Sequence, residues 1–138
     1  MPIDFRMEKK GNYLLVTCQG HFEGKEAMGI HQQALDYAIA EGLPAILVDA
    51  TGLHGRSPTT MDRFGFGEGI AELQRRSRAA VWLALVGKEP IVNPGRFAET
   101  VAVNRGGFMK VFEDTDEVAA WIRRCVTARD GAENDRRS

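Results

Sequence analysis

The chain has few of the residues that usually reveal a chemistry. Its 138 residues include only two cysteines and three histidines. Cys18 and Cys125 are far apart, form no Cys-x-x-Cys pair, and each lies within an apolar pattern that is typical of a reduced core thiol. His21, the first residue of a His-x-Glu sequence, has no downstream Pro-Cys-x-x-Cys of the kind found in zinc deaminases. We therefore expect no metal site and no cofactor.

An excess of one charge and a long apolar segment are also absent. Lys and Arg number 18 against 19 Asp and Glu, so the net charge of -1 produces no field that attracts nucleic acid or an acidic membrane. The longest apolar run, residues 79–86, is far shorter than the roughly 20 residues that span a bilayer. The first ten residues lack the apolar core of a signal peptide. These features predict a cytoplasmic protein without a nucleic-acid partner or a membrane span.

Phosphate-binding loops are missing as well. Gly-Lys-Glu occurs at residues 24–26 and 87–89, without the Ser or Thr that follows the lysine of a P-loop. Gly65, Gly67 and Gly69 alternate inside a predicted helix and do not form Gly-x-Gly-x-x-Gly. Each of these glycines costs about 1 kcal/mol relative to alanine in a helix. We expect a close approach of another helix, or of a second copy of the chain, to compensate.

The composition that remains is ordinary. Hydrophobic residues make up 43% and charged residues 27% of the chain, as in soluble globular proteins. The length predicts a single domain, which we place at residues 1–127. Residues 128–138 contain no apolar side chain larger than alanine, so we expect a disordered tail there.

Strand and helix patterns alternate along the domain. Residues 5–8 and 13–18 flank a turn composition and predict an antiparallel hairpin. Short apolar runs at 45–48, 81–86 and 108–112 predict parallel strands. Helical spacing covers residues 23–41, with Met28, His31, Leu35, Ala38 and Ile39 inward, and also 61–78 and 97–105. The stripe of Val118, Trp121, Ile122, Cys125 and Val126 predicts a last helix that Asp114 and Glu117 cap. The order predicts an α/β fold with about five strands and four helices.

With these elements in place, three phrases resemble a known family. ILVDATGL, RFAETVAVNRGGFMKVF and DTDEVAAWI are together similar to SpoIIAA-like proteins, which are grouped with STAS and SEC14-like domains. The resemblance covers residues 5–126 and implies a compact (βα) superhelix that acts by binding. STAS-type antagonists of anti-sigma factors exchange protein partners under control of a phosphorylated serine. SEC14-like domains imply a lipid or another apolar ligand.

The loop before the second helix departs from the antagonist pattern. The Asp-Ser-Ser-Gly or Asp-Ser-Thr-Gly motif is absent, and residues 55–60 read GRSPTT. Ser57 is the nearest candidate for phosphorylation by position. Two other interpretations concern helix capping: Ser57 caps the helix with Pro58 at its first position, or Thr59 and Asp62 form a capping box. Capping is the favoured role for Ser57.

Several further side chains have both a structural and a functional interpretation. Asp49 ends the strand of residues 45–49 and is expected to orient the exposed loop of residues 51–57 through backbone N–H groups. His31 is expected to be a half-buried packing residue, and His54 to be a solvated loop residue or a ligand contact. Arg63 either joins other cations in a rim that accepts an anionic group or forms ordinary surface ion pairs.

We expect a non-enzymatic regulatory or protein-interaction module that docks its partner through residues 51–60 and the second helix. The alternative is a SEC14-like protein that binds a small or lipid-type ligand between the second and third helices and the sheet. An enzyme using Asp49, His54 or Asp62 is the third interpretation. A homodimer is a further expectation. The predicted site comprises Asp49, Thr51, His54, Arg56, Ser57, Thr59, Asp62 and Arg63.

Overall fold

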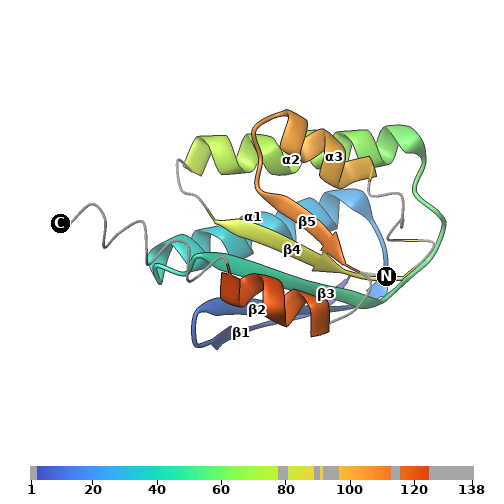
Figure 1. Ribbon diagram of the computed structural model, residues 1–138. Coiled ribbons are helices and arrows are strands. Elements are labelled where there is room, and N and C mark those ends of the chain that lie inside the picture. Colours follow the sequence, from blue (N-terminus) through green and yellow to red (C-terminus); the bar gives the residue numbers. More distant parts are fainter. Residues whose placement is uncertain (1–2, 78–80, 89–90, 92–96, 113–115, 125–138) are drawn as a thin grey trace.

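The protein is built on one mixed five-stranded sheet (Figure 1). The computed structural model describes residues 3–77, 81–88, 91, 97–112 and 116–124. The strands follow the chain in the order β1-β2-β3-β4-β5 across the sheet. Their bounds are β1 (Asp4–Lys10), β2 (Tyr13–His21), β3 (Ala45–His54), β4 (Trp82–Val86) and β5 (Met109–Phe112). β1 and β2 pair antiparallel, as predicted for the hairpin, and the other neighbours pair parallel.

Helices cover both faces of the sheet. The crossover helices are α1 (Gly24–Ala40), α2 (Thr60–Ser77) and α3 (Phe97–Asn104). They lie on one face because β2 to β5 are laid down in sequence and each crossover is expected to have the same hand. Residues 116–124 form a further helix on the opposite face, drawn in orange-red in Figure 1. The predicted α/β fold is confirmed. The tail predicted at residues 128–138 lies outside the described residues.

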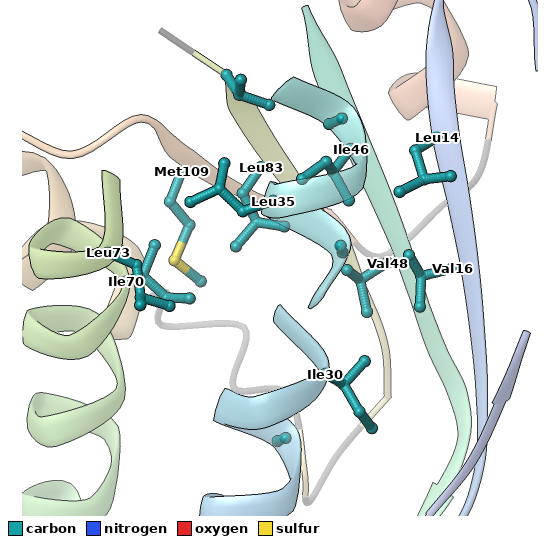
Figure 2. Close-up of a cluster of buried hydrophobic side chains, with 14 of the residues drawn as sticks. Leu14, Val16, Ile30, Leu35, Ile46, Val48, Ile70, Leu73, Leu83 and Met109 are labelled. Atoms are coloured by element: carbon teal, nitrogen blue, oxygen red, sulfur yellow. The ribbon is translucent and has the colours of Figure 1, made fainter. Parts of the chain in front are cut away.

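The larger core lies between the sheet and α1, α2 and α3 (Figure 2). Leu14 and Val16 alternate along β2 toward this face and are fully buried. Ile46 and Val48 of β3 belong to the same core, whereas Leu47 between them belongs to the core on the opposite face. The continuous apolar run at residues 45–48 is therefore a strand covered on both sides, as its pattern predicts.

The smaller core lies under the last helix. Val118, Trp121 and Ile122 pack on β3, β4 and β5, as the predicted stripe requires. The Trp121 ring meets the edge of Trp82 at a centroid distance of 5.2 Å and lies 5.5 Å from Phe112. Cys125 and Val126 of the stripe, and the predicted Asp114 cap, lie outside the described residues.

The ends of α1 agree with its sequence pattern, with one exception. The Glu23 carboxylate accepts hydrogen bonds from the N–H groups of Lys25 and Glu26 at 3.0 and 2.7 Å and caps the helix. Gly42 has a φ of 68°, which is the left-handed stop predicted from its position. Ile39 was predicted to face inward and is 38% exposed. It follows the buried Ala38 and so points away from the core.

β3 is longer than its apolar run, which corrects the predicted loop. Pairing with β2 continues through a bulge, with Gln19 opposite Gly52 and His21 opposite His54. A side chain at residue 52 would place its Cβ 2.8 Å from the carbonyl oxygen of Cys18. Glycine therefore permits the close approach that extends the strand. Residues 51–54 belong to β3, and the connection to α2 begins after them.

A buried glutamine ties α2 to the sheet. Gln74 is 7% exposed, and its Nε2 donates to the carbonyl oxygens of Val81 and Phe108, each at 3.0 Å. Its Oε1 accepts from the N–H of Phe108 at 2.7 Å. The side chain therefore joins the end of α2 to the segments that lead into β4 and β5.

Candidate functional site

A cavity of about 630 Å³ lies between α1, α2 and the sheet, toward the carboxyl ends of the parallel strands. Ligands of open α/β sheets bind in crevices at this edge. Most of the wall is apolar, and both the strands and the helices contribute to it. Its apolar residues include Ile3, Cys18, Phe22, Ala27, Met28, Ile30, Val48, Ala50, Leu53, Phe66, Leu85, Ile91 and Val111. The volume falls in the range of small-molecule sites in proteins.

Polar side chains of the cavity gather where the N-terminal parts of α1 and α2 face each other. Glu23, Lys25, Arg56 and Ser57 are exposed members of the lining and mark its mouth. Hydrogen bonds from the N–H groups of Glu26 and Lys25 hold the pKa of Glu23 below its usual value. The Glu23 carboxylate therefore caps the start of α1.

The start of α2 decides between the two predicted caps. The Thr59 hydroxyl accepts from the N–H of Asp62 at 3.0 Å, and the Asp62 carboxylate accepts from the N–H of Thr59 at 2.9 Å. The hydrogen bond from the Thr59 N–H holds the pKa of the Asp62 carboxyl below its usual value. This is the reciprocal capping box. The interpretation of Ser57 as the cap is wrong, because the helix begins at Thr60 and the box one residue earlier satisfies its first turn.

Asp49 has the orienting role that its sequence context predicts. One carboxylate oxygen accepts from the N–H of Thr51 at 3.0 Å and from the Thr51 hydroxyl at 2.7 Å. Burial raises the pKa of the neighbouring Cys18 thiol, and the negative charge of Asp49 adds a smaller increase. Together they bring this pKa to about 11. Cys18 is therefore an unreactive core thiol.

His54 lies at the end of β3 instead of in a loop. Its ring meets the edge of the His21 ring at a centroid distance of 5.7 Å, and its carbonyl oxygen accepts from the N–H of Phe22 at 2.8 Å. The connection then turns at Gly55, which has a φ of 132°. A Cβ at Gly55 would lie 2.9 Å from the His21 ring. His54 therefore belongs to the paired ends of β2 and β3 and does not line the cavity.

Arg63 reaches across the cavity edge. It is half-buried on α2, and one terminal guanidinium nitrogen donates to the carbonyl oxygen of Ile91 at 3.2 Å. Of the eight residues that the sequence predicts for the site, the structure brings Arg56, Ser57, Asp62 and Arg63 together around the cavity. The others, Asp49, Thr51, His54 and Thr59, organise the adjoining backbone.

His31 is a cavity residue that the sequence did not identify as a site. It is 7% exposed, so it is fully buried where half-burial was expected. Its Nδ1 lies 2.6 Å from the carbonyl oxygen of Ala27, and its ring meets the edge of Phe66 at 5.2 Å. Burial lowers the pKa of His31. Its Nε2 has no hydrogen-bond partner in the part of the chain that the structure describes.

The described residues contain no group of three or more His, Cys, Asp or Glu side chains placed to hold a metal ion. None of the described helices combines the length and apolar character needed to cross a membrane.

Comparison with known proteins identifies the fold. No protein-family model matches the sequence, and no curated protein matches it. Among solved structures, an anti-sigma factor antagonist from Mycobacterium paratuberculosis aligns over 88% of this chain and 94% of its own, with a TM-score of 0.56 and 14% identity. The unphosphorylated antagonist SpoIIAA aligns over 87% of this chain and 98% of its own, with a TM-score of 0.49 and 13% identity.

An uncharacterized protein from Shewanella loihica, described as having a SpoIIAA-like fold, aligns over 88% of this chain and 93% of its own, with a TM-score of 0.47 and 22% identity. The fold assignment rests on the antagonist from Mycobacterium paratuberculosis and on the order and directions of the strands. The chain has the SpoIIAA-like fold of anti-sigma factor antagonists.

Proposed function

We propose that the protein is a non-enzymatic regulatory module that docks a protein partner through the surface between β3 and the first turn of α2. This docking surface consists of the exposed residues Arg56, Ser57, Thr59, Thr60, Met61 and Asp62. The fold shared with an anti-sigma factor antagonist supports a binding role. The observation that carries the proposal is the 74% exposure of Met61, an adaptable apolar side chain, at the head of α2.

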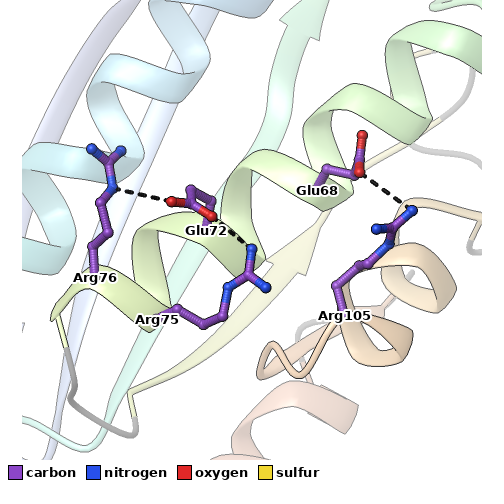
Figure 3. A network of polar contacts seen from close by, with 5 residues as sticks. All are labelled: Glu68, Glu72, Arg75, Arg76 and Arg105. Atoms are coloured by element: carbon purple, nitrogen blue, oxygen red, sulfur yellow. Dashed lines mark hydrogen bonds and ion pairs between the residues drawn. The ribbon is translucent and has the colours of Figure 1, made fainter.

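The remainder of the exposed face of α2 is less suited to docking (Figure 3). Glu72 pairs with Arg75 at 2.6 Å and with Arg76 at 3.7 Å, and Glu68 pairs with Arg105 of the α3 end at 3.4 Å. A partner that docked there would have to break or desolvate these exposed pairs, and exposed ion pairs contribute little free energy. We therefore centre the docking surface on the start of α2 and not on its whole length.

Site-specific photocrosslinking tests this surface. A photoreactive amino acid at position 61 is expected to capture a discrete partner in native extract, and the same label at the exposed Val103 of α3 serves as the matched control. Adding Arg56→Glu to the position-61 probe should abolish the adduct, whereas Arg76→Glu at the far end of α2 should leave it. Identical adducts from positions 61 and 103, or an adduct insensitive to Arg56→Glu, would reject the surface.

Phosphorylation of Ser57 is the regulation that this proposal includes. The side chain is exposed beside Arg56, within the docking surface, and it is free of the capping role. A phosphate there would add about two negative charges next to a guanidinium and change what a partner meets. Phosphopeptide mass spectrometry of protein from its native cell tests this directly: modification of Ser57 supports the switch, and its absence under all growth conditions removes it.

A second candidate function is favoured by the cavity. Its volume and apolar wall suit a small ligand, which corresponds to the SEC14-like alternative. The cavity lies between α1, α2 and the sheet, whereas the sequence-based hypothesis placed the ligand between the second and third helices. Native mass spectrometry of freshly purified protein distinguishes this function from partner docking, since a reproducible excess mass appears only if a ligand is carried. Sedimentation velocity on the same sample tests the expected homodimer.

A further inference from the structure

The hydrogen-bonding state of His31 follows from its surroundings. A carbonyl oxygen can only accept, so the 2.6 Å contact with Ala27 requires the proton on Nδ1. Burial lowers the pKa of this imidazole and favours the neutral ring. Nε2 is then a hydrogen-bond acceptor, and none of the described residues donates to it. A buried acceptor left without a donor costs free energy, which a ligand with a donor would recover.

The position of His31 connects this acceptor with the cavity. His31 is 93% buried and is part of the cavity wall, where its ring packs against Phe66 of α2. Residues on the same stretch of wall, including Ile30 and Val48, are apolar and offer no donor. Among the described lining residues, a molecule that fills the apolar space therefore lies against the ring of His31, whose Nε2 accepts a hydrogen bond.

The mouth of the cavity has a different character. Its two carboxylates, Glu23 and Asp62, accept hydrogen bonds from the backbone at the starts of α1 and α2. Lys25 and Arg56 are exposed and form no ion pair with another described residue. The described lining has three cationic side chains, Lys25, Arg56 and Arg63, against the carboxylates of Glu23 and Asp62, so its net charge is positive.

We propose that this cavity binds a small amphipathic acid: an apolar body whose hydroxyl or N–H group donates to His31 Nε2, with an anionic group at the mouth beside Lys25 and Arg56. This inference rests on the second candidate function and specifies the chemistry of its ligand. It does not depend on partner docking at Met61.

Fluorescent probes of matched shape test the proposal. An anilinonaphthalene sulfonate with the sulfonate on its far ring has the apolar body, the N–H donor and the anionic group, and the parent phenylnaphthylamine lacks only the sulfonate. The sulfonate is expected to bind the folded wild-type protein about tenfold more tightly than the neutral parent, and Arg56→Ala should reduce this difference. Absence of binding by either probe overturns the ligand site, and equal binding overturns the anionic part of the proposal.

Three variants locate the probe. Gly65 lines the cavity on α2 with open space around its Cβ position, so Gly65→Leu should obstruct the cavity while favouring the helix. Gly29 of α1 also has open space but does not line the cavity, which makes Gly29→Leu the matched control. We expect at least tenfold weaker binding for Gly65→Leu and no change for Gly29→Leu. Equal affinities for these two variants would place the probe elsewhere.

His31→Phe tests the hydrogen bond itself. Phenylalanine preserves the ring that packs on Phe66 and removes the acceptor. Binding of the sulfonate should weaken about tenfold while the thermal midpoint does not fall. If wild type and His31→Phe bind equally but Gly65→Leu does not bind, the cavity takes ligands without the His31 contact: the second candidate function then stands and this inference fails.

Discussion

Thr59 and Ser57 lie two residues apart, and only Thr59 contributes to the start of α2. The Thr59 hydroxyl accepts from the N–H of Asp62 and leaves Ser57 without a part in the cap. We expect Thr59→Ala to lower the free energy of unfolding by about 1 kcal/mol, the usual cost of losing an N-cap hydroxyl. Ser57→Ala should change it by less than about 0.5 kcal/mol. Urea denaturation followed by circular dichroism measures both, and equal losses would contradict the assignment.

His31 makes stability depend on pH in a defined direction. Because its pKa in the folded state is below the ordinary 6.5, the unfolded chain binds the proton more readily between the two values. The free energy of unfolding should therefore fall as pH drops below 6.5, and this loss should stop below the folded-state pKa. His31→Phe should lack this component.

Thermal midpoints of wild type and His31→Phe across this range give the comparison. His21 and His54 are present in both proteins, so the difference between the two profiles isolates His31. Parallel profiles would show that His31 is not kept neutral by the fold.

Residue roles were predictable from the sequence where the partner is local. Asp49 bonds to Thr51 two residues away, and the Thr59 box spans three residues, so both are readable as short motifs. His31 appeared only as one member of a helical stripe. Its burial and its unpartnered nitrogen depend on α2 packing against α1, which brings Phe66 onto its ring.

At the scale of elements, Gln74 is the polar link between α2 and the sheet. Gln74→Leu removes its hydrogen bonds and leaves buried groups of Val81 and Phe108 with fewer partners. We expect a loss of about 2 to 3 kcal/mol in the free energy of unfolding. Glu72→Leu, which breaks only exposed ion pairs on the same helix, is the control and should cost less than about 1 kcal/mol. Chemical denaturation measures both, and similar costs would contradict the role given to Gln74.

The element boundaries show which parts of the fold apolar periodicity can predict. Apolar spacing located both ends of α1, α2 and α3 to within one residue, because each helix buries one side. It failed for β3 beyond Asp49, where the side chains are largely exposed and the strand is held by pairing with the end of β2. Exposed strand pairing leaves no apolar pattern in the sequence. Gly52 is the local sign of the bulge, but a glycine there is equally expected in a loop.

At the scale of the whole molecule, the alternation of strands and helices was sufficient to predict the layers. Consecutive parallel crossovers put α1, α2 and α3 on one face, which leaves the last helix to cover the other. The cavity was not predictable in this way. It depends on small residues such as Ala27 and Gly65 on helices that face each other across the end of the sheet. Their effect on the space between the helices appears only after packing.

The helix of residues 116–124 covers the second face of the sheet, and Trp121 is its main contact. The Trp121 ring packs against Trp82 and Phe112 and is 8% exposed. Trp121→Ala removes the largest of the buried side chains in the smaller core and should cost about 3 to 5 kcal/mol in the free energy of unfolding. Arg124→Ala, an exposed position on the same helix, should be within about 0.5 kcal/mol of wild type.

Urea denaturation should be followed by far-ultraviolet circular dichroism, since removal of a tryptophan alters the fluorescence directly. A cost below about 1 kcal/mol for Trp121→Ala would mean that the face formed by β3, β4 and β5 is stable without this helix. A large loss in the free energy of unfolding would show that the helix stabilises the sheet. If the Trp121→Ala protein still binds the cavity probe below its unfolding transition, the helix is not needed for the ligand site on the opposite face.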